Sequence, residues 1–143
     1  MASTNFTNLT RHLSKSDIDF DTNTFKTMLV SSVPTEGNFD SWVFRADVTN
    51  EIASSGGYTA GGVSQAFTLD ALDTTNNRQA VTWTNLSPGW NPSTFAAVGA
   101  IIYQNTGNAA TDRLLHFIDF GGTVTGSGAG YNVNYSTPLY INR

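Results

Sequence analysis

Two hydrophobic runs joined by a polar connection dominate the pattern of the chain. Residues 95 to 104 are apolar at both alternating sets of positions, which is typical of a strand buried on both faces. One set is Phe95, Ala97, Ile101 and Tyr103, and the other is Val98, Ala100 and Ile102. Residues 114 to 120 follow after a glycine-containing polar segment, as in a hairpin, with Leu114, Ile118 and Phe120 on one face and Leu115 and Phe117 on the other. This pair needs a further layer to cover it.

Shorter segments elsewhere have the alternation and the bounding turn residues of strands. They are residues 25 to 30, 51 to 54, 63 to 69, 79 to 84, 131 to 135 and 138 to 141. Val81 and Trp83 are expected to face inward, and residues 87 to 92 to form a rigid, proline-bounded loop that carries Trp90. The count of about eight short strands predicts an all-β fold, a jelly-roll-like antiparallel β-sandwich.

One stretch changes from a period of two to a period of 3.6. Phe39, Trp42, Val43 and Ala46 recur at helical spacing, so we predict an amphipathic helix from 39 to 46 that lies over the sandwich as a lid. Either Asn38 or Asp40 would cap it.

Residues 1 to 24 are polar and weakly patterned. Asn8 is a possible cap for a short helix that runs to Ser14, with Leu9 and Leu13 on its apolar side. The alternative is an extended arm that becomes ordered against a neighbouring molecule. We therefore divide the chain into an N-terminal arm, 1 to 24, and a β-sandwich domain, 25 to 143.

Composition narrows the classes of partner. The 143 residues suit one domain, only 13% are charged, and the net charge is -4. The seven Lys and Arg are scattered singly, which argues against nucleic acid or an anionic membrane as partner. Cysteine is absent, which excludes disulfides and thiolate chemistry. The N-terminus lacks the pattern of a secretory signal, and no apolar run is long enough to span a membrane.

Motifs for catalysis, metals or cofactors are not found, so we expect no enzyme activity, catalytic residue, metal site or cofactor. His116 alternates with Leu114 and Ile118, which favours a structural role. The acidic run 17 to 21 lacks the EF-hand pattern, since Thr22 and Met28 replace the required glycine and glutamate, and we interpret it as a solvated acidic face.

Several segments resemble, in their order and spacing, a group of small virion proteins of tailed bacteriophages. They are Phe25–Val30, Asp47–Glu51, Gly57–Gly62, and Ala100–Ala110 leading into Phe117–Gly121. The resemblance covers roughly residues 25 to 122. It implies a jelly-roll-like capsid cement, or decoration, protein that binds the outside of an assembled head as a dimer or trimer. The implied partners are the major capsid protein and other copies of the chain, and the implied location is the capsid surface, after assembly in the host cytoplasm.

On this interpretation the arm, the helix and the edge strand 131 to 135 contact the partner. The candidate interface residues are Phe6, Leu9, Leu13, Phe39, Trp42, Trp90, Tyr131 and Tyr135. Two alternatives stay open. One is a neck or tail component of the virion, and the other is a carbohydrate-binding module in which Trp90 stacks on a sugar ring.

Overall fold

The computed structural model describes residues 2–142, and most of its regular structure is antiparallel β-sheet. Within this range ten strands form three sheets, where the sequence predicts about eight strands. The strands are β1 (Ser3–Asn5), β2 (Phe25–Val30), β3 (Val63–Gln65), β4 (Phe67–Leu69), β5 (Arg78–Trp83), β6 (Leu86–Trp90), β7 (Ala96–Gln104), β8 (Leu114–Thr125), β9 (Tyr131–Val133) and β10 (Leu139–Asn142). The α-helices of this range are α1 (Asn8–Ser14) and α2 (Glu36–Ser41), and Arg45–Asp47 forms a 3-10 turn. The all-β prediction is confirmed.

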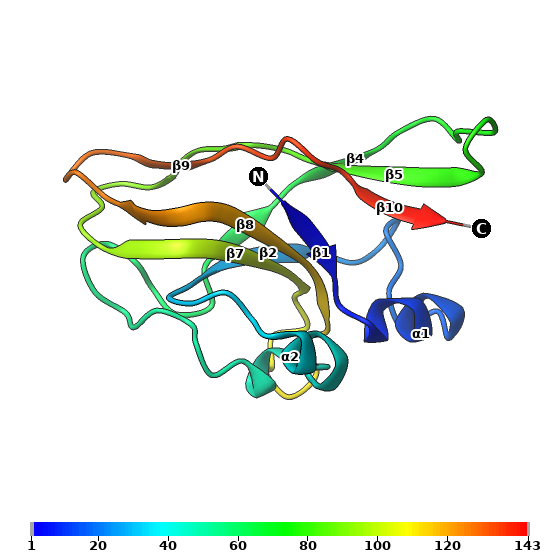
Figure 1. The fold of residues 1–143 in the computed structure, drawn as a ribbon, viewed down its shortest axis with the longest axis horizontal. Helices are drawn as coiled ribbons and strands as arrows, with labels where there is room; N and C mark the ends of the chain where they lie inside the picture. Colours follow the sequence, from blue (N-terminus) through cyan, green and yellow to red (C-terminus); the bar gives the residue numbers. More distant parts are fainter. Residues whose placement is uncertain (1, 143) are drawn as a thin grey trace.

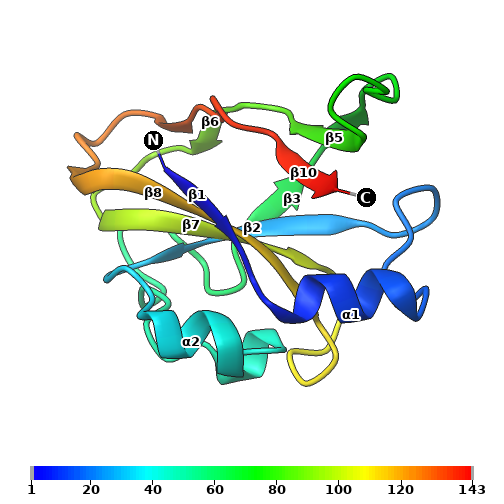
Figure 2. The same ribbon diagram turned by 45° about the vertical axis from the view of Figure 1, so that its right-hand side comes forward.

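The predicted hydrophobic hairpin lies at the centre of the largest sheet. β7 and β8 pair antiparallel, with Ile101 opposite Phe117, and the strand order of the sheet is β1-β8-β7-β2-β3. Figures 1 and 2 show the cover on both faces: the small sheets β10-β5-β4 and β6-β9 lie on one side, and α2 lies on the other. The sandwich-like arrangement therefore follows from the need to bury a two-faced hairpin.

The core consists of three clusters that follow these layers. The β6-β9 cluster contains Leu29, Ile52, Tyr58, Trp90, Phe95, Ala97, Ala100, Ile118, Tyr131 and Val133. The β5-β10 cluster contains Leu9, Ile18, Phe25, Val81, Trp83, Ile102, Leu115 and Leu139. The α2 cluster, on the opposite face of the central sheet, contains Phe6, Met28, Val30, Phe39, Trp42, Ile101, Tyr103, Leu114 and Phe117.

An irregular stretch of the β7–β8 pairing changes which side chains of β7 share a face. The pairing with β8 shifts register between Ala97 and Gly99. Ala97 and Gly99 are two residues apart in β7, whereas their partners Val124 and Asp119 are five residues apart in β8, and the alternation of side chains changes phase across this irregularity. Phe95 and Ala97 consequently pack with Ala100 in the β6-β9 cluster, and the predicted grouping of both with Ile101 is wrong.

A second irregularity has the same effect in β8. Leu115 is the additional residue there, because the strand partners of Ile102 and Tyr103 lie on either side of it. Leu114 therefore packs with Phe117 in the α2 cluster, whereas the simple alternation places these two on opposite faces.

The segment predicted as one strand from 63 to 69 is two strands in different sheets. β3 pairs with β2 in the central sheet, β4 pairs with β5 in the covering sheet, and Ala66 lies between them. The side chain of Gln65 holds this crossing in place, because its Nε2 donates to the carbonyls of Ala66 and Thr84 at 2.8 and 2.7 Å. The chain thus changes layers within two residues.

Two further predictions, one of a strand and one of a loop, are wrong. Residues 51 to 54 form no strand, and Glu51 makes only an isolated bridge to Val30. Residues 87 to 92, expected as a loop, instead supply most of β6, which pairs with β9. Pro88 has no N–H to donate, and the pairing is accordingly irregular between Leu86 and Trp90.

The predicted helix 39 to 46 begins and ends earlier than expected. Thr35 caps α2 in a capping box: its Oγ1 accepts from the N–H of Asn38, and the Asn38 side chain accepts from the N–H of Thr35. The predicted caps, Asn38 and Asp40, are therefore wrong. The helix stops at Ser41, but Phe39 still covers the central sheet as expected.

The N-terminal segment belongs to the same domain as the rest. α1 confirms the predicted helix, although Asn8 is its first residue and not its cap. Before it, β1 extends the central sheet by pairing with β8, with Ser3 opposite Ile118, and Phe6 is only 1% exposed. The predicted boundary at residue 24 is wrong, because residues 3 to 18 help to build the core.

The segments that carry the phage resemblance meet in space. The carboxylate of Glu51 accepts hydrogen bonds from the Tyr58 hydroxyl at 2.7 Å and from the N–H of Gly61 at 2.5 Å. Tyr58 in turn accepts from the N–H of Leu29 in β2, and the Tyr103 hydroxyl of β7 donates to the carbonyl of Gly61. These residues fasten the 57–62 loop to the central sheet, so their spacing in the sequence reflects the fold.

Candidate binding surface

Most of the eight predicted interface residues lie inside the domain. Six of them are at most 8% exposed: Phe6, Leu9, Phe39, Trp42, Trp90 and Tyr131. Leu13 and Tyr135 are half-buried. Because a buried side chain has no surface to offer a partner, the prediction that those six form a contact surface is wrong in this conformation.

Trp90 also cannot serve as a platform for a sugar ring. Its indole is 5% exposed and lies 5.7 Å from the Tyr58 ring, 5.9 Å from Phe95 and 6.1 Å from Tyr131, measured between centroids. These rings surround Trp90 with the tilted and edge-on contacts that aromatic side chains favour in cores. The residue plugs the space between β6-β9 and the central sheet.

Tyr135 takes part in a hydrogen-bond network that joins the two layers. Its hydroxyl donates to Oε1 of Gln65 at 2.6 Å and lies 3.0 Å from Oγ1 of Thr27. Thr27 also donates to Oε1 of Gln65, at 2.7 Å. Burial raises the pKa of Tyr135, so the hydroxyl keeps its proton and this network is satisfied within the domain.

His116 is a packed structural residue, as its alternation predicts. It is 1% exposed, and its Nδ1 accepts a hydrogen bond of 3.1 Å from Nε1 of Trp83. An acceptor Nδ1 requires the neutral imidazole with its proton on Nε2. Burial lowers the pKa of His116 to about 4, so the ring is neutral at physiological pH.

We expect stability to fall in mild acid because of His116. Between pH 6.5 and 4 the unfolded chain protonates this ring while the folded one does not, so the free energy of unfolding decreases as pH falls, by up to about 3 kcal/mol from this group. Urea unfolding at pH 7.5, 6 and 5 measures the slope. In His116→Gln, whose amide can accept from Trp83 but does not titrate, most of the slope disappears. An unchanged slope would contradict this account.

The acidic run 17 to 21 is used for local structure. Asp19 accepts hydrogen bonds from the N–H of Asp21 at 2.8 Å and from the Thr22 hydroxyl at 2.9 Å, while Asp17 faces His12. Among residues 2–142 no three His, Asp or Glu side chains are grouped closely enough to hold a metal ion.

Among residues 2–142 four large apolar side chains are exposed, and two of them lie together on the β4–β5 hairpin, whereas Val33 and Val124 lie elsewhere. Leu69, the last residue of β4, is 42% exposed, and Leu72, in the loop that follows β4, is 67% exposed. Figure 1 shows this loop extending beyond the sheets at one end of the molecule. We call residues 69 to 78 the hairpin tip.

The hairpin tip is held in one conformation by Asp73. Its carboxylate accepts from the backbone N–H groups of Thr75 and Asn76, from the Asn76 amide and from Nε of Arg78, the last at 3.2 Å. These bonds, that from the Asn76 side chain above all, lower the pKa of Asp73. The guanidinium of Arg78 also lies over the Tyr140 ring of β10, 3.9 Å from its centroid.

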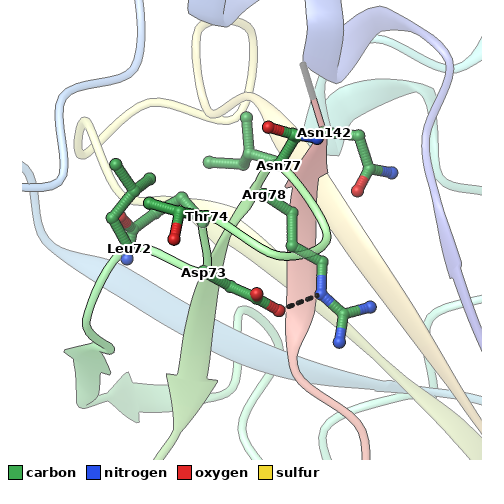
Figure 3. Close-up of a pocket in the computed structure, with 8 residues that line it drawn as sticks. Leu72, Asp73, Thr74, Asn77, Arg78 and Asn142 are labelled. Atoms are coloured by element: carbon green, nitrogen blue, oxygen red, sulfur yellow. Dashed lines mark hydrogen bonds and ion pairs between the residues drawn. The ribbon is translucent and has the colours of Figure 1, made fainter.

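A hollow of about 400 Å³ lies between the hairpin tip and the end of β10. Figure 3 shows Leu72 and Thr74 on one side of it and Asn142 on the other, with the Asp73–Arg78 ion pair below them. It offers an apolar rim with a few polar groups, which suits a side chain of another protein. Sequence reasoning missed this surface, although a leucine in the mostly polar segment 70 to 77 was a signal for it.

β4 adds backbone groups to this surface. It is the outer strand of the order β10-β5-β4, so among the described residues one of its edges pairs with no other strand. An open edge can pair with a strand of another chain.

Of the helices between residues 2 and 142, none has the length and apolar character that crossing a membrane requires. Comparisons of the chain with protein-family models, with curated proteins and with solved structures found no match.

Proposed function

We propose that this protein is a viral structural protein, a capsid cement or decoration protein that binds the outside of an assembled phage head and stabilises it. We propose further that the strands are connected as in a jelly roll, that the major capsid protein is the partner, and that the protein is located on the capsid surface. The observation that carries it is the hairpin tip, where two exposed leucines and an open strand edge project from an otherwise well-packed body.

The shape of the protein suits binding to another surface better than catalysis. A rigid antiparallel body with one projecting apolar tip can dock on a repeated surface, and each contact can be weak because many copies bind one particle. The order and spacing of the segments resembling phage virion proteins support the same conclusion. A neck or tail component would use the same contacts at a few copies per particle, and quantitative mass spectrometry of purified virions separates that outcome from a decoration protein.

We expect Leu72→Ser to reduce binding to heads that lack the protein by about tenfold, because it removes the most exposed apolar side chain of the tip. Stability should change little, since Leu72 is 67% exposed. Co-sedimentation of purified protein with heads measures occupancy.

Val124→Ser is the matched control, since Val124 is 43% exposed and lies one residue before the end of β8. Figure 1 shows that end of β8 on the opposite side of the molecule from the hairpin tip. It should bind like the unaltered protein. Equal binding by both variants would show that the hairpin tip is not the contact surface. If neither the unaltered protein nor any variant bound to heads, the proposal that the protein binds a capsid would be wrong.

A further inference from the structure

A second hollow, of about 300 Å³, lies where α1 meets the start of β8, and we call it the basic pocket. Arg11 and Lys15 line it from α1 and its C-cap, and Arg113 lines it from the residue before β8. Three of the seven Lys and Arg of the chain thus meet in one place, although the protein carries a net charge of -4. Arg11 and Lys15 are one helical turn apart, and the tertiary structure adds Arg113 to them.

The charges of the basic pocket do not cancel. Asp17 is the one acidic residue that lines it, against three cationic side chains, so the lining carries a charge of 3 - 1 = +2 with His12 neutral. Asp17 lies 3.7 Å from Nη2 of Arg113 and 3.4 Å from Nδ1 of His12. Neither Arg11 nor Lys15 forms an ion pair within residues 2–142. The pocket therefore has positive charge to spare for an anion.

Two residues that line the basic pocket have buried polar atoms without a hydrogen-bond partner. Within residues 2–142 three buried side-chain polar atoms have no partner, and two of them, Nε2 of His12 and Nε of Arg113, belong to residues that line the basic pocket. Buried polar atoms in folded proteins are nearly always hydrogen-bonded, so an unpaired pair at one hollow indicates a missing partner. His12 is 5% exposed and yet lines this hollow.

The protonation of His12 decides what that partner can be. With Nδ1–H donating to Asp17, the Nε2 of a neutral ring carries a lone pair and cannot donate. The protonated ring offers Nε2–H as a further donor. Burial lowers the pKa of His12, and the positive charges of Arg113 and Arg11 lower it further, whereas Asp17 raises it. A bound anion would offset the positive charges of the two arginines and so raise the pKa of His12.

We propose that the basic pocket binds a compact oxyanion, with the phosphate dianion as the best match, and that His12 takes up a proton when it binds. The donors come from α1 with its C-cap and from the residue before β8, so they approach from different directions, and four acceptor oxygens suit them better than the two of a carboxylate. The charge of +2 complements a dianion. This site is separate from the hairpin tip and does not depend on the proposed function.

The test is titration of the full chain with inorganic phosphate, with chloride holding the ionic strength constant, followed by NMR of the histidine rings. The chain has only two histidines, so His116 serves as an internal reference. We expect saturable shifts of His12, not of His116, and a higher titration midpoint for His12 in phosphate than in chloride. Acetate should bind more weakly than phosphate.

Two variants localise the site. Arg11→Gln and Lys15→Gln remove exposed charges without disturbing the core, and each should weaken phosphate binding about fivefold. Lys26→Gln makes the same charge change on β2, away from the pocket, and should leave the affinity unchanged. Shifts that rise linearly without saturation, or an equal loss in Lys26→Gln, would overturn the site. Acetate binding as tight as phosphate would overturn the choice of ligand, and an unchanged His12 midpoint would overturn the proton uptake.

Discussion

Gly62→Ala should destabilise the protein by roughly 3 kcal/mol or more, the largest effect we expect from adding one methyl group. Gly62 has φ +69, and a Cβ there would lie 1.8 Å from the carbonyl oxygen of Thr27 and 2.8 Å from the Cα of Met28. Both atoms are backbone of β2, an inner strand of the central sheet, so no rotation of a side chain can relieve the contact. Urea unfolding at neutral pH measures the loss.

Gly107→Ala separates the two sources of this cost. Gly107 also has positive φ, at +87, but a Cβ there would meet nothing within 4 Å. It should cost only the strain of the left-handed backbone, about 1 to 2 kcal/mol. If Gly62→Ala and Gly107→Ala proved equally stable, the close approach of the 57–62 loop to β2 would not be a stabilising feature.

Trp83→Ala is expected to lower the free energy of unfolding by about 4 kcal/mol. The side chain is 2% exposed and packs between the two layers against Phe25 and Phe67, with ring centroids 5.9 and 6.0 Å away. Truncation leaves a cavity there and also leaves Nδ1 of His116 without its donor. Chemical denaturation followed by far-UV circular dichroism measures the change.

Trp83→Phe is the control that keeps an aromatic ring but removes the indole N–H and reduces the size of the ring system. It should cost about 1 to 2 kcal/mol, the penalty of an unpaired buried acceptor plus a smaller ring. A loss under about 1 kcal/mol for Trp83→Ala itself would mean that the β5-β10 cluster does not hold the small sheet to the central one.

The candidate binding surface was predicted much less well than the fold. The sequence identified apolar residues such as Phe6, Trp42 and Trp90 as contacts, and the structure buries them. Hydrophobicity indicates that a side chain is removed from water, but not whether its own chain or a partner removes it. Leu72 shows the converse: its mostly polar sequence neighbours indicate a loop, but the position of the β4–β5 hairpin decides that this leucine stays exposed.

By itself, the sequence determined that residues 95 to 120 form a hairpin buried on both faces and that short strands must cover it, because period-two apolarity on two faces leaves no other way to exclude water. Only the tertiary structure shows which side chains of β7 and β8 lie on the same face of the sheet, since the register shifts in these strands are set by pairing between strands. It also decided which distant residues meet. Arg113 joins Arg11 and Lys15 at one pocket because the packing of α1 against β8 brings it there, and no local pattern in the chain encodes that contact.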